Sequence, residues 1–88
     1  MESFEKAKQT ALKSLAKRPR SVYEVRKKLE EAGVSAQTIE ETIEYCLGLD
    51  YLNDARLARD WISWRLRENP AGKLLIRFEL RERGIDEA

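Results

Sequence analysis

The chain has 88 residues, 38% of them charged and 42% hydrophobic, with 17 basic and 16 acidic side chains for a net charge of +1. This length excludes a separate catalytic domain, and the balanced charge excludes a strong overall attraction to nucleic acid or membranes. No apolar run approaches the roughly 20 residues of a membrane span, and the single cysteine, Cys46, cannot form an internal disulfide. We therefore expect a soluble cytoplasmic protein made of charged amphipathic helices.

Apolar residues three and four positions apart predict a first helix over residues 2–17, and Pro19 ends it. The apolar stripe of this helix consists of Phe4, Ala7, Ala11 and Leu15. A second helix begins at Ser21, because Ser21 and Glu24 have the spacing of a capping box, and it ends at Gly33. Its apolar face is formed by Val22, Val25 and Leu29.

Ser35 is the expected N-cap of a third helix, with an apolar stripe of Ala36, Ile39, Ile43 and Leu47. Asn53 or Asp54 caps a fourth helix, over roughly residues 54–68. Because this helix is apolar on two faces, we expect it to have neighbours on two sides. Beyond Pro70, a fifth helix runs to Gly84. Its apolar positions are Leu74, Leu75, Ile76, Phe78 and Leu80.

The two halves of the chain align without a gap at an offset of 51 residues, as from Pro19 to Pro70. The other matched pairs are Leu15 and Leu66, Val25 and Ile76, Arg26 and Arg77, Leu29 and Leu80, Glu31 and Glu82, Gly33 and Gly84, and Val34 and Ile85. Matching helix ends and core positions indicate an all-α protein of tandem three-helix repeats.

We expect residues 1–52 to form the first repeat and residues 53–88 a truncated second repeat of two helices. The counterpart of residues 38–50 is missing, so the five helices make about one and two-thirds repeats. An apolar surface without its third helix predicts self-association through the fourth and fifth helices, or else a frayed fifth helix.

No pattern in the chain points to catalysis or to a cofactor or metal site. Histidine is absent, as are a phosphate-binding loop and a cluster with metal-ligand spacing. Acidic residues lie beside basic ones at helical spacings, as Glu24 does with Lys28, which is typical of a solvated helix face. We interpret Cys46 as a small buried hydrophobe rather than a reactive thiol.

Basic residues gather around Pro19 and on the second, fourth and fifth helices, and they can contact phosphate, contact an acidic protein surface, or simply be solvated. The candidate partner-binding residues are Arg18, Arg20, Arg26, Lys27, Arg56, Arg59, Trp64, Arg65, Lys73, Arg77 and Arg81. We interpret Trp61 as core and Trp64 as an edge residue able to stack on a base. A helix-turn-helix DNA reader is disfavoured, because its recognition helix would carry Glu40, Glu41 and Glu44.

Three groups of residues in order resemble the RecX family, bacterial regulators of the recombinase RecA. The first is Ala11, Leu12, Leu15, Arg18, Arg20, Ser21, Glu24, Val25, Leu29 and Gly33; the second is Ile39, Ile43, Leu47, Tyr51, Leu52, Asn53 and Asp54; the third is Arg56, Ala58, Trp61, Arg65, Pro70, Gly72, Leu80, Gly84 and Ile85. The chain departs from the family pattern at Asp50, where glycine is usual, and at Asn53, where aspartate is common. The family has three tandem repeats, more than this chain holds.

The resemblance implies a non-enzymatic regulator acting in DNA recombination, DNA repair and the SOS response. Such proteins lodge along the groove of the RecA–DNA filament and inhibit strand exchange, ATP hydrolysis and co-protease activity. The alternative is a nucleic-acid-binding helical module that uses its basic face directly. A third reading is an inert fragment whose missing repeats carry the binding. Weak contact with single-stranded DNA is compatible with the first two readings.

Overall fold

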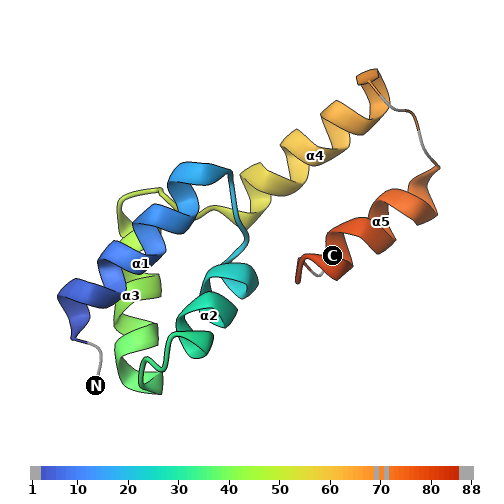
Figure 1. The fold of residues 1–88 in the computed structure, drawn as a ribbon. Coiled ribbons are helices and arrows are strands. Elements are labelled where there is room, and N and C mark those ends of the chain that lie inside the picture. The colour runs from blue at the N-terminus through green and yellow to red at the C-terminus, as the bar shows by residue number, and fades with distance from the viewer. Residues whose placement is uncertain (1–2, 69, 71, 86–88) are drawn as a thin grey trace.

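A computed structural model describes residues 3–68, 70 and 72–85 of the chain. These residues form five helices and no strand, as predicted: α1 (Phe4–Lys17), α2 (Val22–Glu31), α3 (Ala36–Gly48), α4 (Asp54–Glu68) and α5 (Lys73–Glu82). α1, α2 and α3 pack together at one end of a molecule of 44 × 20 × 19 Å. α4 leads away from this group, and α5 runs back beside α4 until its C-terminal end approaches α2 (Figure 1).

Side-chain caps explain where the first four helices begin. Ser21 accepts a hydrogen bond from the backbone N–H of Glu24, and the Glu24 carboxylate accepts one from the N–H of Ser21, so the predicted capping box is formed. Ser3 and Ser35 cap α1 and α3 with one bond each, by accepting from the N–H of Lys6 and of Thr38. Asn53 caps α4 by accepting from the N–H of Arg56. α5 begins after Gly72, which offers no side-chain cap.

The core of the first three helices follows the predicted stripes except at Phe4, Ala36 and Leu47, which are exposed. Its members are Ala7, Ala11, Val25, Leu29, Val34, Ile39, Ile43, Cys46 and Leu52. Leu47, which the sequence placed in the stripe, is 46% exposed, and Cys46 is fully buried instead. Cys46 lies three residues after Ile43, and Leu47 lies four residues after it. Both spacings place a residue close to the same face of a helix, and in α3 the buried position is Cys46. Burial raises the pKa of the Cys46 thiol, as suits a packed hydrophobe.

The second core, between α4 and α5, repeats the first. It contains Leu57, Ala58, Ile76, Leu80 and Ile85, of which the last four match Ala7, Val25, Leu29 and Val34 of the first core at the 51-residue offset. The helix ends also repeat. Gly33 and Gly84 have φ values of 82° and 81°, and the following residue donates to the carbonyl of Leu29 in α2 and of Leu80 in α5.

Much of the apolar surface of the second unit stays uncovered. Leu66 is 61% exposed and Leu74 is 79% exposed, and Leu75 and Phe78 are also exposed. In the first unit α3 packs against both α1 and α2, whereas the described residues contain no third helix beside α4 and α5. The expected incomplete coverage of the second unit is therefore present in the structure. No helix of the described part is long and apolar enough to span a membrane.

The turn after α3 places Asp50 in a backbone conformation that favours glycine. Asp50 has a φ of 61°, in the left-handed region that glycine adopts without strain. Its carboxylate accepts hydrogen bonds from Arg56, at 2.6 Å, and from the side chain of Asn53. These hydrogen bonds, together with the positive charge of Arg56, lower the pKa of Asp50. Asp50 thus supports the turn through polar contacts that glycine cannot make.

Candidate partner interface

The two units meet where the residue after α5 reaches the first turn of α2. The Arg83 guanidinium donates to both carboxylate oxygens of Glu24, at 3.0 and 3.1 Å, and to the carbonyl of Pro19 at 3.0 Å. In return, the hydroxyl of Ser21 donates to the carbonyl of Arg83. Bidentate pairing restricts the guanidinium to one orientation, so these bonds fix the end of α5 against α2.

The other end of the second unit contacts the same turn. The first residue of α4, Asp54, accepts a hydrogen bond from the backbone N–H of Val22 at 2.9 Å. Gly84 lies so close to the side chain of Tyr23 that a Cβ at this position would overlap it. Backbone N–H groups in the first turn of a helix lack intrahelical partners, and carboxylates satisfy them well. α2 is therefore the element that holds both ends of the second unit.

The environment of Glu24 favours its charged form. Burial acts to raise the pKa of Glu24, but the hydrogen bonds from Arg83 and from the Ser21 backbone, with the positive charges of Arg83 and Arg18, hold it below the ordinary value of 4.5. The carboxylate is ionised at neutral pH and pairs with Arg83 there. The contact between the units therefore carries a fixed negative charge on α2 and a fixed positive charge beyond α5.

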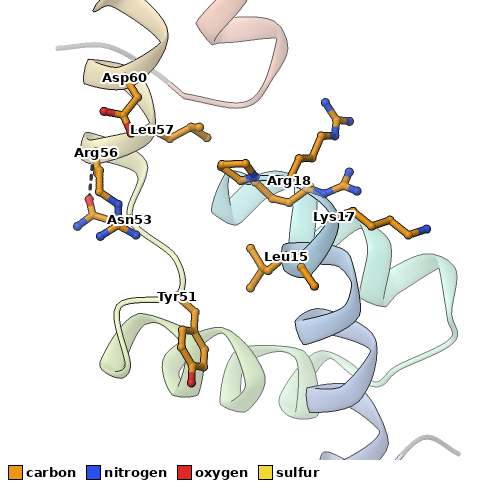
Figure 2. A pocket seen from close by; sticks show the side chains of 11 residues that line it. Leu15, Lys17, Arg18, Tyr51, Asn53, Arg56, Leu57 and Asp60 are labelled. Carbon is orange, nitrogen blue, oxygen red and sulfur yellow. Dashed lines mark hydrogen bonds between the residues drawn. The ribbon is translucent and has the colours of Figure 1, made fainter.

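A groove runs beside this junction, and we call it the junction groove. Its first part is a pocket of about 400 Å³ between the end of α1 and the start of α4. Figure 2 shows Lys17 and Arg18 on the α1 side and Asn53, Arg56 and Asp60 on the α4 side. The second part, of about 300 Å³, continues along α4 to the tryptophans. The two parts share Arg18, Pro19, Leu57 and Asp60, so they lie next to each other.

The α4 end of the junction groove is aromatic. The rings of Trp61 and Trp64 are tilted by 54° with their centroids 5.2 Å apart. Trp61 is half-buried and its indole N–H donates to Glu79 at 2.9 Å, so its position is fixed. Trp64 is 40% exposed and has the Arg65 guanidinium 5.8 Å from its ring. The interpretation of Trp61 as a packed residue and Trp64 as an edge residue agrees with these exposures.

The candidate basic residues divide into exposed side chains and side chains that are already paired within the chain. Arg18, Lys27, Arg59, Lys73, Arg77 and Arg81 are exposed and available to a partner. Arg20 donates to the carbonyl of Ser14, and Arg26 and Arg56 pair with Glu40 and Asp50. Of the candidates, only Arg18, Arg20, Arg56 and Trp64 line the junction groove. Whether any of these residues binds a partner stays a prediction.

Arg65 has a structural role. Its side chain is 9% exposed and forms two hydrogen bonds to the Glu79 carboxylate, at 3.0 and 2.8 Å. Arg65 corresponds to Ser14 at the 51-residue offset, and both positions are buried. Ser14, its counterpart in the first unit, is small and uncharged. Comparing the two units in the sequence therefore does not indicate that Arg65 is buried. We therefore set Arg65 apart from the partner surface.

Sequence reasoning did not select Lys17, Asp60 or Arg83 as site residues. Lys17 and Arg83 are members of the basic clusters seen in the sequence, but only the fold places them at the junction groove. Asp60 is an acidic residue that lines the groove among the basic ones. Nothing in its spacing in the sequence indicates that it lies there. No group of three or more histidine, cysteine, aspartate or glutamate side chains within the described ranges is placed to hold a metal ion.

The repeated cores and helix ends define the class of protein as a small helical-repeat protein built from related three-helix units. Family models agree on both units. Residues 7–46 match the first three-helix domain of RecX, and residues 53–88 match the second. The chain belongs to the RecX family.

Individual relatives cover nearly all of the chain. It is 39% identical over 80 residues to the regulatory protein RecX of Prosthecochloris aestuarii, which is 91% of this chain and 53% of that protein. It is 37% identical to the protein of the same name in Lactobacillus johnsonii, over 90% of this chain and 29% of that protein. The crystal structure of RecX from Lactobacillus salivarius superposes with a TM-score of 0.92 and 28% identity, over 94% of this chain and 54% of that one. The chain thus spans about half or less of the length of these relatives.

Proposed function

We propose that this protein is a non-enzymatic inhibitor of the RecA recombinase that binds the RecA–DNA filament. In this proposal it reduces strand exchange, ATP hydrolysis and co-protease activity by occupying the filament. The observation that carries the proposal is the match of both three-helix units to the first and second RecX domains. Relatives over most of the chain are named regulatory proteins, which supports a regulator rather than an enzyme.

The proposal includes a division of the chain and a location. Residues 1–52 act as the first repeat and residues 53–88 as the second, a division supported by the two separate cores. The hydrogen bonds of Arg83 to Glu24 in α2 link the two repeats. A cytoplasmic location is supported by the single cysteine, because a protein without disulfides suits a reducing compartment.

The filament-binding surface in this proposal consists of the exposed basic side chains. They are spread over α2, α4, α5 and the α1–α2 turn, so they suit a long, shallow contact better than a small pocket. The elongated shape, 44 Å in its longest dimension, supports the same kind of contact. The members of this surface are Arg18, Lys27, Arg59, Lys73, Arg77 and Arg81.

A titration of RecA ATP hydrolysis tests the proposed function. The protein is added to RecA filaments preformed on single-stranded DNA, and hydrolysis and filament binding are followed together. We expect hydrolysis to fall with increasing protein and to level off when binding saturates. An unchanged rate at saturating protein would contradict inhibition, and a full effect at strongly substoichiometric protein without filament binding would contradict action by occupancy.

Charge reversal tests the proposed surface. Arg18→Glu and Arg77→Glu, made separately, should weaken filament binding while circular dichroism shows an unchanged fold, because both side chains are exposed. Glu41→Lys, on the exposed face of α3, is the matched control and should leave binding unchanged or strengthen it. We expect tighter binding to the filament than to bare DNA. Equal affinity for the two would favour the alternative of a nucleic-acid-binding module.

A further inference from the structure

We propose that the junction groove binds single-stranded nucleic acid, with one base stacked on Trp64 and the adjoining phosphates held by Lys17 and Arg18. The inference goes beyond the proposed function, because it concerns this chain alone and free nucleic acid. The groove combines an aromatic part, which suits a base, with a basic part, which suits phosphates. Four independent features of the groove support it.

The first feature is a preorganised aromatic surface. Trp64 is 40% exposed, and its ring is flanked by Trp61 and by the guanidinium of Arg65. Both neighbours are fixed in turn by Glu79, which accepts hydrogen bonds from Trp61 and from Arg65. A partly exposed indole beside two neighbours that are held in place offers a base a surface for stacking.

The second feature is a set of cations close to this surface. Arg18 lines both parts of the groove, and Lys17 and Arg20 line the part next to α1. Among the residues that the structure describes, neither Lys17 nor Arg18 forms an ion pair, so their charges remain for a ligand. Each phosphate that such a cation neutralises releases a condensed counterion and so favours binding.

The third feature is the position of Asp60 on the wall that the two parts share. A carboxylate there repels phosphates and accepts hydrogen bonds. The phosphates therefore belong at the α1 end, and the edge of a base, which carries N–H groups, belongs beside Asp60. An acidic peptide would place its carboxylates along the whole groove and would meet this repulsion.

The fourth feature is size. The two parts have volumes of about 400 and 300 Å³, which suit one or two nucleotides and not a duplex. In a duplex the base faces are covered by their neighbours and cannot reach Trp64, whereas a single strand can turn its bases outward. The groove thus selects for the single-stranded form.

The test uses a labelled oligothymidylate, an abasic oligonucleotide of the same length, and the full chain. Anisotropy gives affinity, and quenching of tryptophan fluorescence reports stacking. We expect the oligothymidylate to quench fluorescence and the abasic strand to bind more weakly without quenching. Trp64→Ala should lose fivefold to 150-fold in affinity, which corresponds to the roughly 1–3 kcal/mol that a stacked base contributes. Trp64→Phe should retain most of the affinity, because it keeps an aromatic face.

Matched controls separate the groove from general surface effects. Phe78 is an exposed aromatic outside the groove, and Phe78→Ala should leave the affinity unchanged. Arg18→Gln should reduce the slope of log affinity against log salt by about 0.7, the value for one phosphate contact on a single strand. Lys6→Gln, at an exposed position outside the groove and outside the proposed filament-binding surface, should leave the slope unchanged. Equal affinity for the abasic strand, or equal effects of Trp64→Ala and Phe78→Ala, would overturn the inference.

The same variants, assayed on RecA filaments, keep the two proposals distinguishable. Trp64-dependent oligonucleotide binding supports the inference whether or not the wild-type chain inhibits ATP hydrolysis. If Trp64→Ala weakens filament binding but leaves oligonucleotide binding unchanged, the groove binds a protein surface and the inference is wrong. Circular dichroism of each variant shows that any loss of binding is not a loss of the fold.

Discussion

The guanidinium of Arg83 forms two hydrogen bonds to the carboxylate of Glu24, which lies 59 residues earlier in the chain. Glu24 at the same time closes the capping box of α2 on Ser21. One carboxylate thus stabilises the start of α2 and the end of the second unit. This sharing couples the two units, because the second unit cannot separate without leaving Glu24 and the Ser21 hydroxyl short of a partner.

Arg83→Gln should destabilise the second unit. Hydrogen bonds to charged groups contribute about 1.5–3 kcal/mol each when enclosed, and the side chains of Arg83 and Glu24 are 15% and 21% exposed. Because water replaces part of the lost bonding at these partly exposed groups, we expect a total loss of about 1.5–3 kcal/mol in the free energy of unfolding, measured by urea denaturation. Hydrogen exchange should rise more in α5 than in α2. Arg81→Gln, at an exposed position, is the control and should change stability by no more than about 0.5 kcal/mol. Equal losses in the two variants would contradict the coupling.

The stability of the protein should fall in acid partly through Glu24. The pKa of Glu24 is lower in the folded chain than its ordinary value of 4.5, so the unfolded state binds the proton more readily. Its stabilising contribution is complete above the unfolded pKa and is lost as the pH falls through the folded pKa. Denaturation midpoints measured from pH 6 down to pH 3 should therefore decline less steeply in Glu24→Gln. Asp50, whose pKa is also lowered, accounts for part of the remaining slope. An identical slope in the variant would refute the assignment.

The two left-handed glycines provide a matched pair. Gly33→Ala and Gly84→Ala place a Cβ at nearly the same φ, so each should cost about 1–2 kcal/mol in backbone strain. At Gly33 the added Cβ meets no atom within 4 Å, whereas at Gly84 it overlaps the Tyr23 side chain. Gly84→Ala should therefore be the more destabilising by urea denaturation. It should also loosen α5 in hydrogen exchange, an effect that Gly33→Ala should lack.

Ser21→Ala should cost more than an ordinary cap. Its hydroxyl accepts from the N–H of Glu24 and donates to the carbonyl of Arg83, and the residue is fully buried. Ser35 caps α3 from an exposed position, so Ser35→Ala should cost about 0.5–1 kcal/mol. For Ser21→Ala we expect about 2–3 kcal/mol, because an additional buried carbonyl loses its partner. Thermal denaturation of the two variants side by side decides this, and equal shifts would show that the bond to Arg83 contributes nothing.

Self-association through α4 and α5 stays a prediction. Leu74 and Phe78 are 79% and 57% exposed on one side of α5, and a patch of this kind favours burial against a partner. Sedimentation over a concentration series should show association that Leu74→Glu weakens. Leu47→Glu, at a 46% exposed position on α3, is the control. A strictly monomeric chain, with hydrogen exchange in residues 72–85 as slow as in α2, would show that the exposed face needs no partner.

The sequence alone determined the helices and the repeat. Ser21, Glu24 and the two glycines act on their own helix ends, through contacts within a few residues, so their roles are visible in the chain. Helical periodicity likewise identified Val25 and Leu29 in α2 and Ile76 and Leu80 in α5 as core. It misplaced Leu47, because at the end of a short helix the neighbouring position, Cys46, serves the same face equally well. Phe4 and Ala36, at the starts of their helices, and Leu66 and Leu75 in the second unit are exposed as well.

The tertiary structure decided what the charged side chains do. Arg65 and Arg83 appear in the sequence as two more basic residues on amphipathic helices, like Arg77 and Arg81 that are exposed. Only the packing of α5 against α4 places Glu79 beside Arg65, and only the return of α5 to α2 places Glu24 beside Arg83. Long charged side chains can be solvated at almost any helix position, so periodicity does not distinguish an exposed arginine from a paired one. The difference depends on contacts between residues far apart in the chain, which exist only once the helices have packed.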